Sequence, residues 1–252
     1  MIRGIYTSAS GMMAETVRTD TISNNLANGN TAGYKKDVAI NKDFASILTM
    51  RIENEESDPN IGGMGVGVVT DKIVTVHNPG SIQPTGNTFD LAINGKGYFA
   101  VETPAGIRYT RNGSFTRSNR GELVTMDGYR VLGQNGPVQI NTGDQNVSKI
   151  SVDGTGRISV DGAEVDRLRL VDFADDQQLG KEGASLFLAG PNAVEQAATG
   201  QVSQGYLESS NVNPISEMVN LISAYRAYEI NAKTVQAHDQ LMDKAVNDVA
   251  RV

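Results

Sequence analysis

Apolar positions follow three different patterns along the chain, and the first is helical. In residues 1–28 apolar or small residues recur at steps of three and four, which is the spacing of one face of a helix. These positions are Ile5, Ala9, Met12, Thr16, Thr19, Ile22 and Leu26. Asn28-Gly29 and then Gly33 predict the end of this helix. Because threonine and alanine hold several of these positions, we expect the helix to be marginal on its own.

A second helical pattern runs from about Pro214 to Val252. Asn213 is a good N-cap, and Pro214 then takes the first helical position, where its missing N–H costs nothing. One broad apolar side comprises Ile215, Met218, Val219, Ile222, Ala227, Ile230, Thr234, Ala237, Leu241, Ala245 and Val249. A second side comprises Leu221, Tyr225, Tyr228, Ala232, Val235, Met242 and Val246. A helix that is apolar on two sides needs more than one neighbour, so we expect both chain ends to fold on assembly.

The middle of the chain has the pattern of short strands. The predicted strands are Val66–Val76, Phe89–Asn94, Tyr98–Glu102, Arg108–Thr110, Glu122–Met126, Tyr129–Leu132, Ile150–Val152, Arg157–Val160 and Leu168–Phe173. Hairpin turns are predicted at Asn94-Gly95, Asn112-Gly113, Asp127-Gly128, Asn135-Gly136, Asp153-Gly154 and Asp161-Gly162. This pattern indicates one all-β domain built of hairpins.

The expected fold class is therefore α+β by content, with terminal helices that form a coiled-coil domain and a central all-β domain. The helical domain is discontinuous and comprises residues 1–34 and 214–252. The β domain comprises residues 62–213. Residues 35–61 form a connector, whose acidic patch we interpret as a solvated segment. That patch is Glu53, Glu55, Glu56 and Asp58. Striped helices at both ends can pack on each other or on neighbouring copies, which predicts an assembling protein.

Composition excludes several kinds of partner and chemistry. The formal net charge is −7 and no Lys/Arg cluster interrupts it, so we expect no nucleic-acid partner. No run of about 18 apolar residues exists, so no membrane insertion is expected. The N-terminus lacks the features of a cleaved secretory leader. Cysteine is absent, which excludes disulfides and cysteine-based sites.

Candidate catalytic chemistry is also missing. His77 and His238 belong to different patterns, and neither has the spacing of a metal ligand. The stretch Gly95–Ala100 matches a loose dinucleotide pattern, but a strand rather than a helix is predicted after it. We interpret it as a glycine hairpin. We therefore expect no enzyme activity, no catalytic residues, no cofactor and no metal.

Several stretches carry more specific signatures. They are N-N-L-A-N at 24–28 with T-x-G-Y-K at 31–35, the strand pair Asp90–Val101, the stretches Tyr109–Phe115 and Gly121–Thr125, and Gly205–Asn213 followed by Glu217-Met218-Val219 and Arg226–Glu229. In this order they resemble the family of flagellar rod and hook proteins, the axial proteins of the bacterial basal body. The segment Tyr129–Val138 resembles the proximal-rod type more than the distal type.

The resemblance implies a structural subunit of the basal-body rod that polymerises through its terminal helices and transmits torque between motor and hook. It implies partners among the axial proteins of rod and hook, and export by the flagellar type III apparatus without a cleaved signal peptide. The implied location is the flagellar basal body, in the cell envelope outside the cytoplasmic membrane.

The candidate site is then an assembly interface on the helices. Its expected residues are Ile5, Met12, Ile22, Asn25, Leu26, Met218, Ile222, Ile230 and Leu241. For the asparagines at 24, 25, 28 and 30, local capping of the helix end is favoured over bonds between subunits.

The alternative function is a secreted β-rich carbohydrate-active or adhesive domain. A sugar-stacking platform needs aromatic residues, yet tryptophan is absent and aromatics make up 6% of the chain. That alternative also gives no reason for two long terminal helices.

Overall fold

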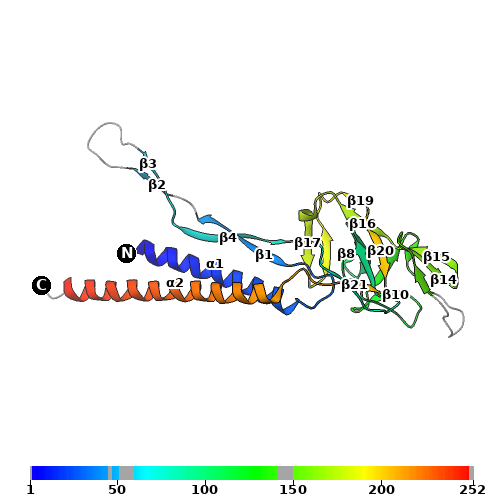
Figure 1. Cartoon of the computed structure of the whole chain (residues 1–252). Coiled ribbons are helices and arrows are strands. Elements are labelled where there is room, and N and C mark those ends of the chain that lie inside the picture. Colours follow the sequence, from blue (N-terminus) through cyan, green and yellow to red (C-terminus); the bar gives the residue numbers. More distant parts are fainter. Residues whose placement is uncertain (1, 45–46, 51–59, 141–149, 250–252) are drawn as a thin grey trace. The chain divides into compact units, whose positions relative to one another are not determined.

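The computed structural model describes residues 2–44, 47–50, 60–140 and 150–249, and it divides the chain into two compact units. The helical unit contains residues 1–26, 37–74 and 213–252, and the β unit contains residues 27–36 and 75–212. The chain therefore passes from one unit to the other four times. Helices at both ends and antiparallel strands between them confirm the α+β class (Figure 1).

The helical unit includes part of the expected connector. Strands β1 (Asp37–Phe44) and β2 (Ile47–Met50) lie in the connector. The acidic patch of the connector, at 53–58, lies outside the described residues. The domain boundaries expected from the sequence stay a prediction, and they differ from the limits of the compact units because β1 and β4 (Gly67–Thr75) pair with each other within the helical unit.

Both predicted helices are confirmed. Helix α1 spans Ile2–Ala27, and helix α2 spans Pro214–Val249. The N-cap of α2 is made as expected, because the N–H groups of Ile215 and Ser216 donate to Asn213 Oδ1 over 3.1 and 3.2 Å.

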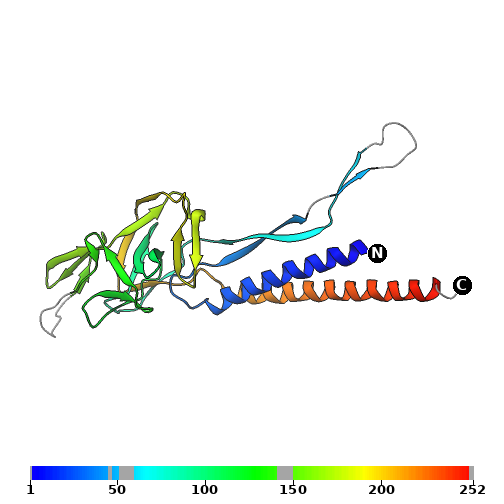
Figure 2. The same cartoon turned by 180° about the vertical axis from the view of Figure 1, so that it is seen from behind.

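The two helices lie side by side in both views (Figures 1 and 2). A Cβ added to Gly4 would lie 2.5 Å from His238 Nε2, and one added to Gly11 would lie 2.9 Å from Asn231 Nδ2. Seven residues separate the two contacts in each helix, in opposite chain directions. The pair is therefore antiparallel, and its two glycines allow a close approach of α1 to α2.

A two-stranded ribbon, β1 with β4, completes the helical unit, together with the pair of β2 and β3 (Asn60–Met64). Thr7 donates from Oγ1 to the Val66 carbonyl over 2.9 Å, and the Val68 N–H donates to Ser10 Oγ over 3.2 Å. Side chains of α1 thus hold the beginning of β4.

The β unit is built around one large antiparallel sheet with the strand order β17-β18-β8-β7-β11-β10-β9. Its strands are β7 (Tyr98–Thr103), β8 (Gly106–Thr110), β9 (Phe115–Arg117), β10 (Leu123–Thr125), β11 (Arg130–Gly133), β17 (Leu179–Glu182) and β18 (Leu186–Ala189). Attached to it are β12 (Gly136–Pro137), β16 (Leu170–Phe173) and β19 (Glu195–Ala197).

Smaller sheets extend this arrangement. A three-stranded sheet contains β13 (Ile150–Val152), β14 (Arg157–Val160) and β15 (Ala163–Arg167). Strand β6 (Leu91–Asn94) pairs with β20 (Gln201–Gln204), and β5 (Ile82–Pro84) pairs with β21 (Tyr206–Glu208). A short 3₁₀ helix, η1 (Asp176–Gln178), precedes β17.

Strand β7 lies at the centre of the core because it is buried on both faces. Successive side chains of a strand point to opposite faces. Phe99 and Val101 pack in one hydrophobic cluster with Phe115, while Tyr98 and Ala100 pack in another. The β unit therefore has two apolar layers, one on each side of the same strand.

Four of the six predicted hairpins are confirmed. The turns Asp127-Gly128, Asn135-Gly136, Asp153-Gly154 and Asp161-Gly162 each lie at the junction of two paired strands. At the last of these, both residues adopt positive φ (52° and 86°), as a two-residue hairpin loop requires.

The hairpins predicted at Asn94-Gly95 and Asn112-Gly113 are wrong. Strand β6 pairs with β20 and not with β7, so Gly95 follows a strand that belongs to another sheet. A Cβ at Gly113 would lie 1.6 Å from the Leu91 carbonyl oxygen. Glycine is required there for a close backbone approach rather than for a tight turn. The stretch Gly95–Ala100 does lead into strand β7, as expected, which leaves no helix for a dinucleotide.

Candidate functional site

The largest group of exposed apolar side chains lies on helix α2, and we name it the open face. Its members are Ile215, Met218, Val219, Ile222, Ile230 and Leu241. Each of these residues is 45–72% exposed, although all are strongly hydrophobic. Leu221, Val235 and Met242, on the second apolar side, are half-buried. Tyr225, Tyr228 and Val246 of that second side are exposed as well, so the described residues cover it only in part.

Helix α1 buries a different set of residues from the one expected for assembly. Ile22 and Asn25 are buried within the chain, with 6% and 1% exposure, whereas Ile5, Met12 and Leu26 are half-buried. The most exposed large apolar residues of α1 are Tyr6 and Met13 (67% and 72%). Their spacing of seven residues, a helical signal in the sequence, could have identified them.

The amide of Asn25 joins the end of α1 to the beginning of β1. Its Nδ2 donates to the Asp37 carbonyl over 2.8 Å, and its Oδ1 accepts from the Asp37 N–H over 2.9 Å. The side chain therefore bonds the backbone as a neighbouring strand would, a contact twelve residues along the chain that local capping does not include. Asn28 does act locally, since its Oδ1 accepts from Thr31 Oγ1 over 3.3 Å.

A second feature is a group of three buried charged residues in the β unit, which we name the charge cluster. Lys35 Nζ lies 2.5 Å from Glu208 Oε1, and Arg111 Nη1 lies 3.3 Å from Glu208 Oε2. The side chains of Lys35 and Glu208 are each 1% exposed and that of Arg111 is 7% exposed. Two cations thus share one carboxylate away from water.

Backbone groups add further hydrogen bonds to the charge cluster. Lys35 Nζ donates to the Asn78 carbonyl over 2.9 Å, and the Gly80 N–H donates to Glu208 Oε1 over 2.9 Å. Burial lowers the pKa of Lys35, and attraction to Glu208 opposes that shift.

The guanidinium of Arg111 is held on several sides. It donates to the carbonyls of Ile93 and Gly95 over 3.2 and 2.8 Å, and it lies over the ring of Tyr98 at 5.2 Å from the centroid. These bonds explain the unexpected role of Gly95, whose carbonyl is turned toward Arg111 instead of into a hairpin.

Sequence reasoning missed the charge cluster. Lys35 ends the T-x-G-Y-K stretch, Arg111 lies in Tyr109–Phe115 and Glu208 lies in Gly205–Asn213. Three signature stretches therefore meet at one point. Lys35 and Glu208 are 173 residues apart, and no spacing rule joins charges over that distance.

The two histidines lie in different surroundings. His77 Nδ1 is 2.9 Å from the hydroxyl of Tyr98, which also donates to Asp176 Oδ1 over 3.2 Å. His238 packs on Gly4 in the helix pair. Each histidine belongs to its own unit.

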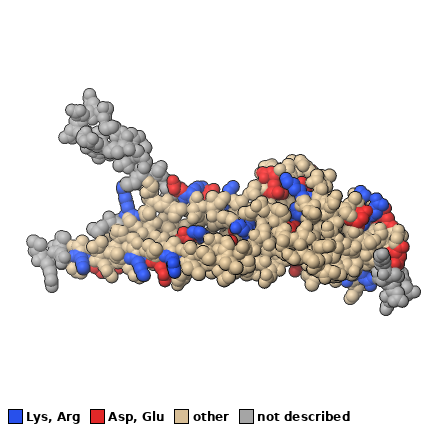
Figure 3. Space-filling view, viewed as in Figure 1, with Lys and Arg blue, Asp and Glu red and all other residues tan. Residues whose placement is uncertain are grey.

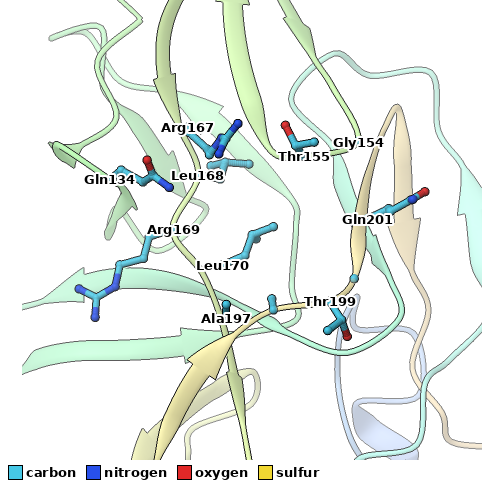
Figure 4. Close-up of a pocket in the computed structure, with 12 residues that line it drawn as sticks. Gln134, Gly154, Thr155, Arg167, Leu168, Arg169, Leu170, Ala197, Thr199 and Gln201 are labelled. Atoms are coloured by element: carbon cyan, nitrogen blue, oxygen red, sulfur yellow. The ribbon is translucent and has the colours of Figure 1, made fainter.

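A cavity of about 560 Å³ opens beside the segment Arg167–Leu170. Figure 4 shows the two leucines of that segment between the arginines on one side and Thr155 and Thr199 on the other. Among the described residues that line it, there is no carboxylate and no histidine. It therefore lacks the pair of acids that sugar hydrolysis requires.

The described part of the chain contains neither a metal-ligand cluster nor a membrane-spanning helix. Within residues 2–44, 47–50, 60–140 and 150–249, no three acidic or histidine side chains are grouped as metal ligands would be. Over the same residues, neither helix contains a stretch that is both long and apolar enough to cross a membrane.

Three segments of the chain match families described from other proteins. Residues 5–35 match "Flagella basal body rod protein", residues 92–160 match "Flagellar hook protein FlgE/F/G D1 domain", and residues 203–248 match "Flagellar basal body rod FlgEFG protein C-terminal". Each of the three matched segments contains one residue of the charge cluster, namely Lys35, Arg111 and Glu208 in chain order.

Similar proteins cover almost the whole chain. The flagellar basal-body rod protein FlgG of Bacillus subtilis is 35% identical, over 98% of this chain and 99% of its own length. FlgG of Caulobacter vibrioides is 36% identical, over 96% and 97%. The rod protein FlgF of the same bacterium is 34% identical over 100% of both chains. The proximal-rod type favoured by the sequence is compatible with these relatives.

Proposed function

Because the chain belongs to the family of flagellar basal-body rod and hook proteins, we propose that it polymerises into the rod through the exposed faces of α1 and α2. It is a structural subunit of the basal-body rod and not an enzyme. The observation that supports polymerisation through the helices is the open face of α2, whose six large apolar side chains are 45–72% exposed in the described part of the chain.

Burial of exposed apolar area would stabilise the contact between subunits. Burying an exposed leucine, isoleucine, valine or methionine side chain contributes about 1.5–3 kcal/mol. Six such residues on α2, with Tyr6 and Met13 on α1, supply enough area to hold a neighbouring subunit. On the face seen in Figure 3, acidic and basic side chains are interspersed with uncharged surface, so long-range charge attraction is not required for contact.

The same proposal includes the binding partners of the subunit, its export route and its location in the cell, and the family supports it. The partners are further copies of this chain and other axial proteins of rod and hook. The subunit leaves the cytoplasm through the flagellar export apparatus, without cleavage of a signal peptide, and lies in the cell envelope outside the cytoplasmic membrane. In the rod it transmits torque between motor and hook.

Ile222→Asp tests the open face. A carboxylate at this position would have to be buried between subunits, where truncation of a buried isoleucine alone costs about 2–5 kcal/mol. We expect the variant to fold its β unit but to form no rods, as seen by electron microscopy of basal bodies and by loss of swimming.

Gln236→Asp is the matched control, because it adds the same charge at an exposed polar position of α2. It should assemble normally. Rods of normal number in the Ile222→Asp strain would show that the open face is not the assembly surface.

A further inference from the structure

The places where the chain leaves the β unit are bonded to one another. The side chain of Asn211 accepts from the Lys36 N–H over 2.8 Å and donates to the Val76 carbonyl over 2.8 Å. The Gly33 N–H donates to the Glu208 carbonyl over 2.7 Å. The β unit comprises two segments, 27–36 and 75–212, and the stretches of chain at three of their ends, those at 36, 75 and 212, therefore meet here.

The charge cluster lies among these same stretches. Lys35 comes from the first, Glu208 from the last, and Asn78 and Gly80, which bond them, from the second. None of these four residues belongs to either hydrophobic cluster of the β unit. The contacts that join these stretches of the chain here are thus polar.

We propose that Glu208 is a positioning residue, which clasps residues 27–36 and 205–212 against residues 75–80 and so sets where the chain leaves the β unit toward its helices. The clasp is a property of the single subunit. Its consequence, that a subunit without it assembles poorly, rests on the proposed function above.

The charges of the cluster give the clasp a specific signature. Glu208→Gln keeps the size of the side chain but leaves Lys35 and Arg111 buried together without a counter-charge. Lys35→Met removes one cation and leaves Arg111 and Glu208 as a balanced pair. We therefore expect Glu208→Gln to open the clasp much more than Lys35→Met. A role in packing alone would give the two variants similar effects.

Hydrogen exchange on the dilute full chain measures this opening directly. In Glu208→Gln the amides of Gly33, Lys36 and Ser209 should exchange at least about tenfold faster than in the unchanged chain, because each donates a hydrogen bond within the clasp. Amides of the central strands β7 and β11 should keep their rates within about twofold. Lys35→Met should give an intermediate increase at the same three amides.

Glu164→Gln is the matched control, since it removes a carboxylate that is 53% exposed and paired with Arg157 on the surface. In this control the amides of Gly33, Lys36 and Ser209 should exchange at the same rates as in the unchanged chain. Unaltered rates at Gly33, Lys36 and Ser209 in Glu208→Gln would overturn the clasp. So would equal acceleration of clasp and central-strand amides in both Glu208→Gln and Lys35→Met, because that would place the cluster in the core. An Ile222→Asp chain should keep the clasp closed, which separates this result from a failure of the proposed assembly surface.

Discussion

Single buried groups in the β unit have titration behaviour that their surroundings explain. The Tyr109 hydroxyl is buried and donates to Glu195, and both effects raise its pKa, burial first, to about 12. Burial also raises the pKa of Tyr98. The ammonium of Lys35 is shifted the other way, because burial disfavours its charged form. Burial thus disfavours the charged form in each case, which raises the pKa of the two tyrosines and lowers that of Lys35.

Tyr109 gives a pH-dependent prediction. Its pKa is raised above the unfolded value of 10.0, so its contribution to stability is complete below pH 10 and is lost as the pH rises toward 12. We expect the free energy of unfolding to fall by about 2–3 kcal/mol over that range from this residue. Urea unfolding between pH 9 and pH 11.5 measures it. Tyr109→Phe should flatten the decline, and an identical slope in the variant would contradict the assignment.

At the scale of elements, the turn after α1 depends on one glycine. Gly33 has a φ of +67°, and a Cβ there would lie 2.3 Å from the backbone carbon of Arg111 and the backbone nitrogen of Asn112. Backbone atoms cannot move aside as a flexible side chain can. The turn is therefore constrained both by its conformation and by the strand segment against which it lies.

Gly86 makes a matched comparison, because it has a similar φ of +74° with nothing near its added Cβ. Gly86→Ala should cost only the strain of a left-handed residue, about 1–2 kcal/mol. Gly33→Ala should cost at least about 2 kcal/mol more, from displaced backbone. Thermal unfolding of the β unit compares them. Equal costs for the two variants would mean that the close approach at Gly33 is easily relieved.

For the whole molecule, the two units differ in how much of their apolar surface is buried within a single chain. The β unit has apolar layers on both sides of β7, whereas the helical unit leaves the open face of α2 uncovered. Between α1 and α2, Gly4 and Gly11 lie against the polar side chains of His238 and Asn231, so these two contacts bury little apolar area. Ordering a helix costs about 1–2 kcal/mol per residue, and these contacts offset only part of it.

Folding of the helices should therefore be coupled to assembly. In a dilute monomer we expect amides of 1–28 and 215–252 to exchange almost at once, while those of β7, β8 and β11 stay protected. In assembled rods both sets should be protected. Strong protection of α1 and α2 in a verified monomer would mean that the antiparallel pair is stable alone, and the coupling would be refuted.

The sequence by itself determined the features that depend on neighbouring residues. Helix limits follow from Asn213-Pro214 and Asn28-Gly29, and four hairpins follow from their Asx-Gly turns, because caps and turns are satisfied within a few residues. The stripe on α2 likewise indicated an assembling helix. The signature stretches identified the family for the same reason, since each is a continuous run of the chain.

Only the tertiary structure decided which distant groups meet. Asn94-Gly95 resembles a hairpin turn, yet the carbonyl of Gly95 serves Arg111, and β6 pairs with β20. Asn25 bonds the backbone of Asp37, twelve residues further along the chain. Lys35 and Glu208 carry no mark of their pairing in the sequence, because a buried ion pair depends on the burial that the rest of the fold provides and not on any local spacing.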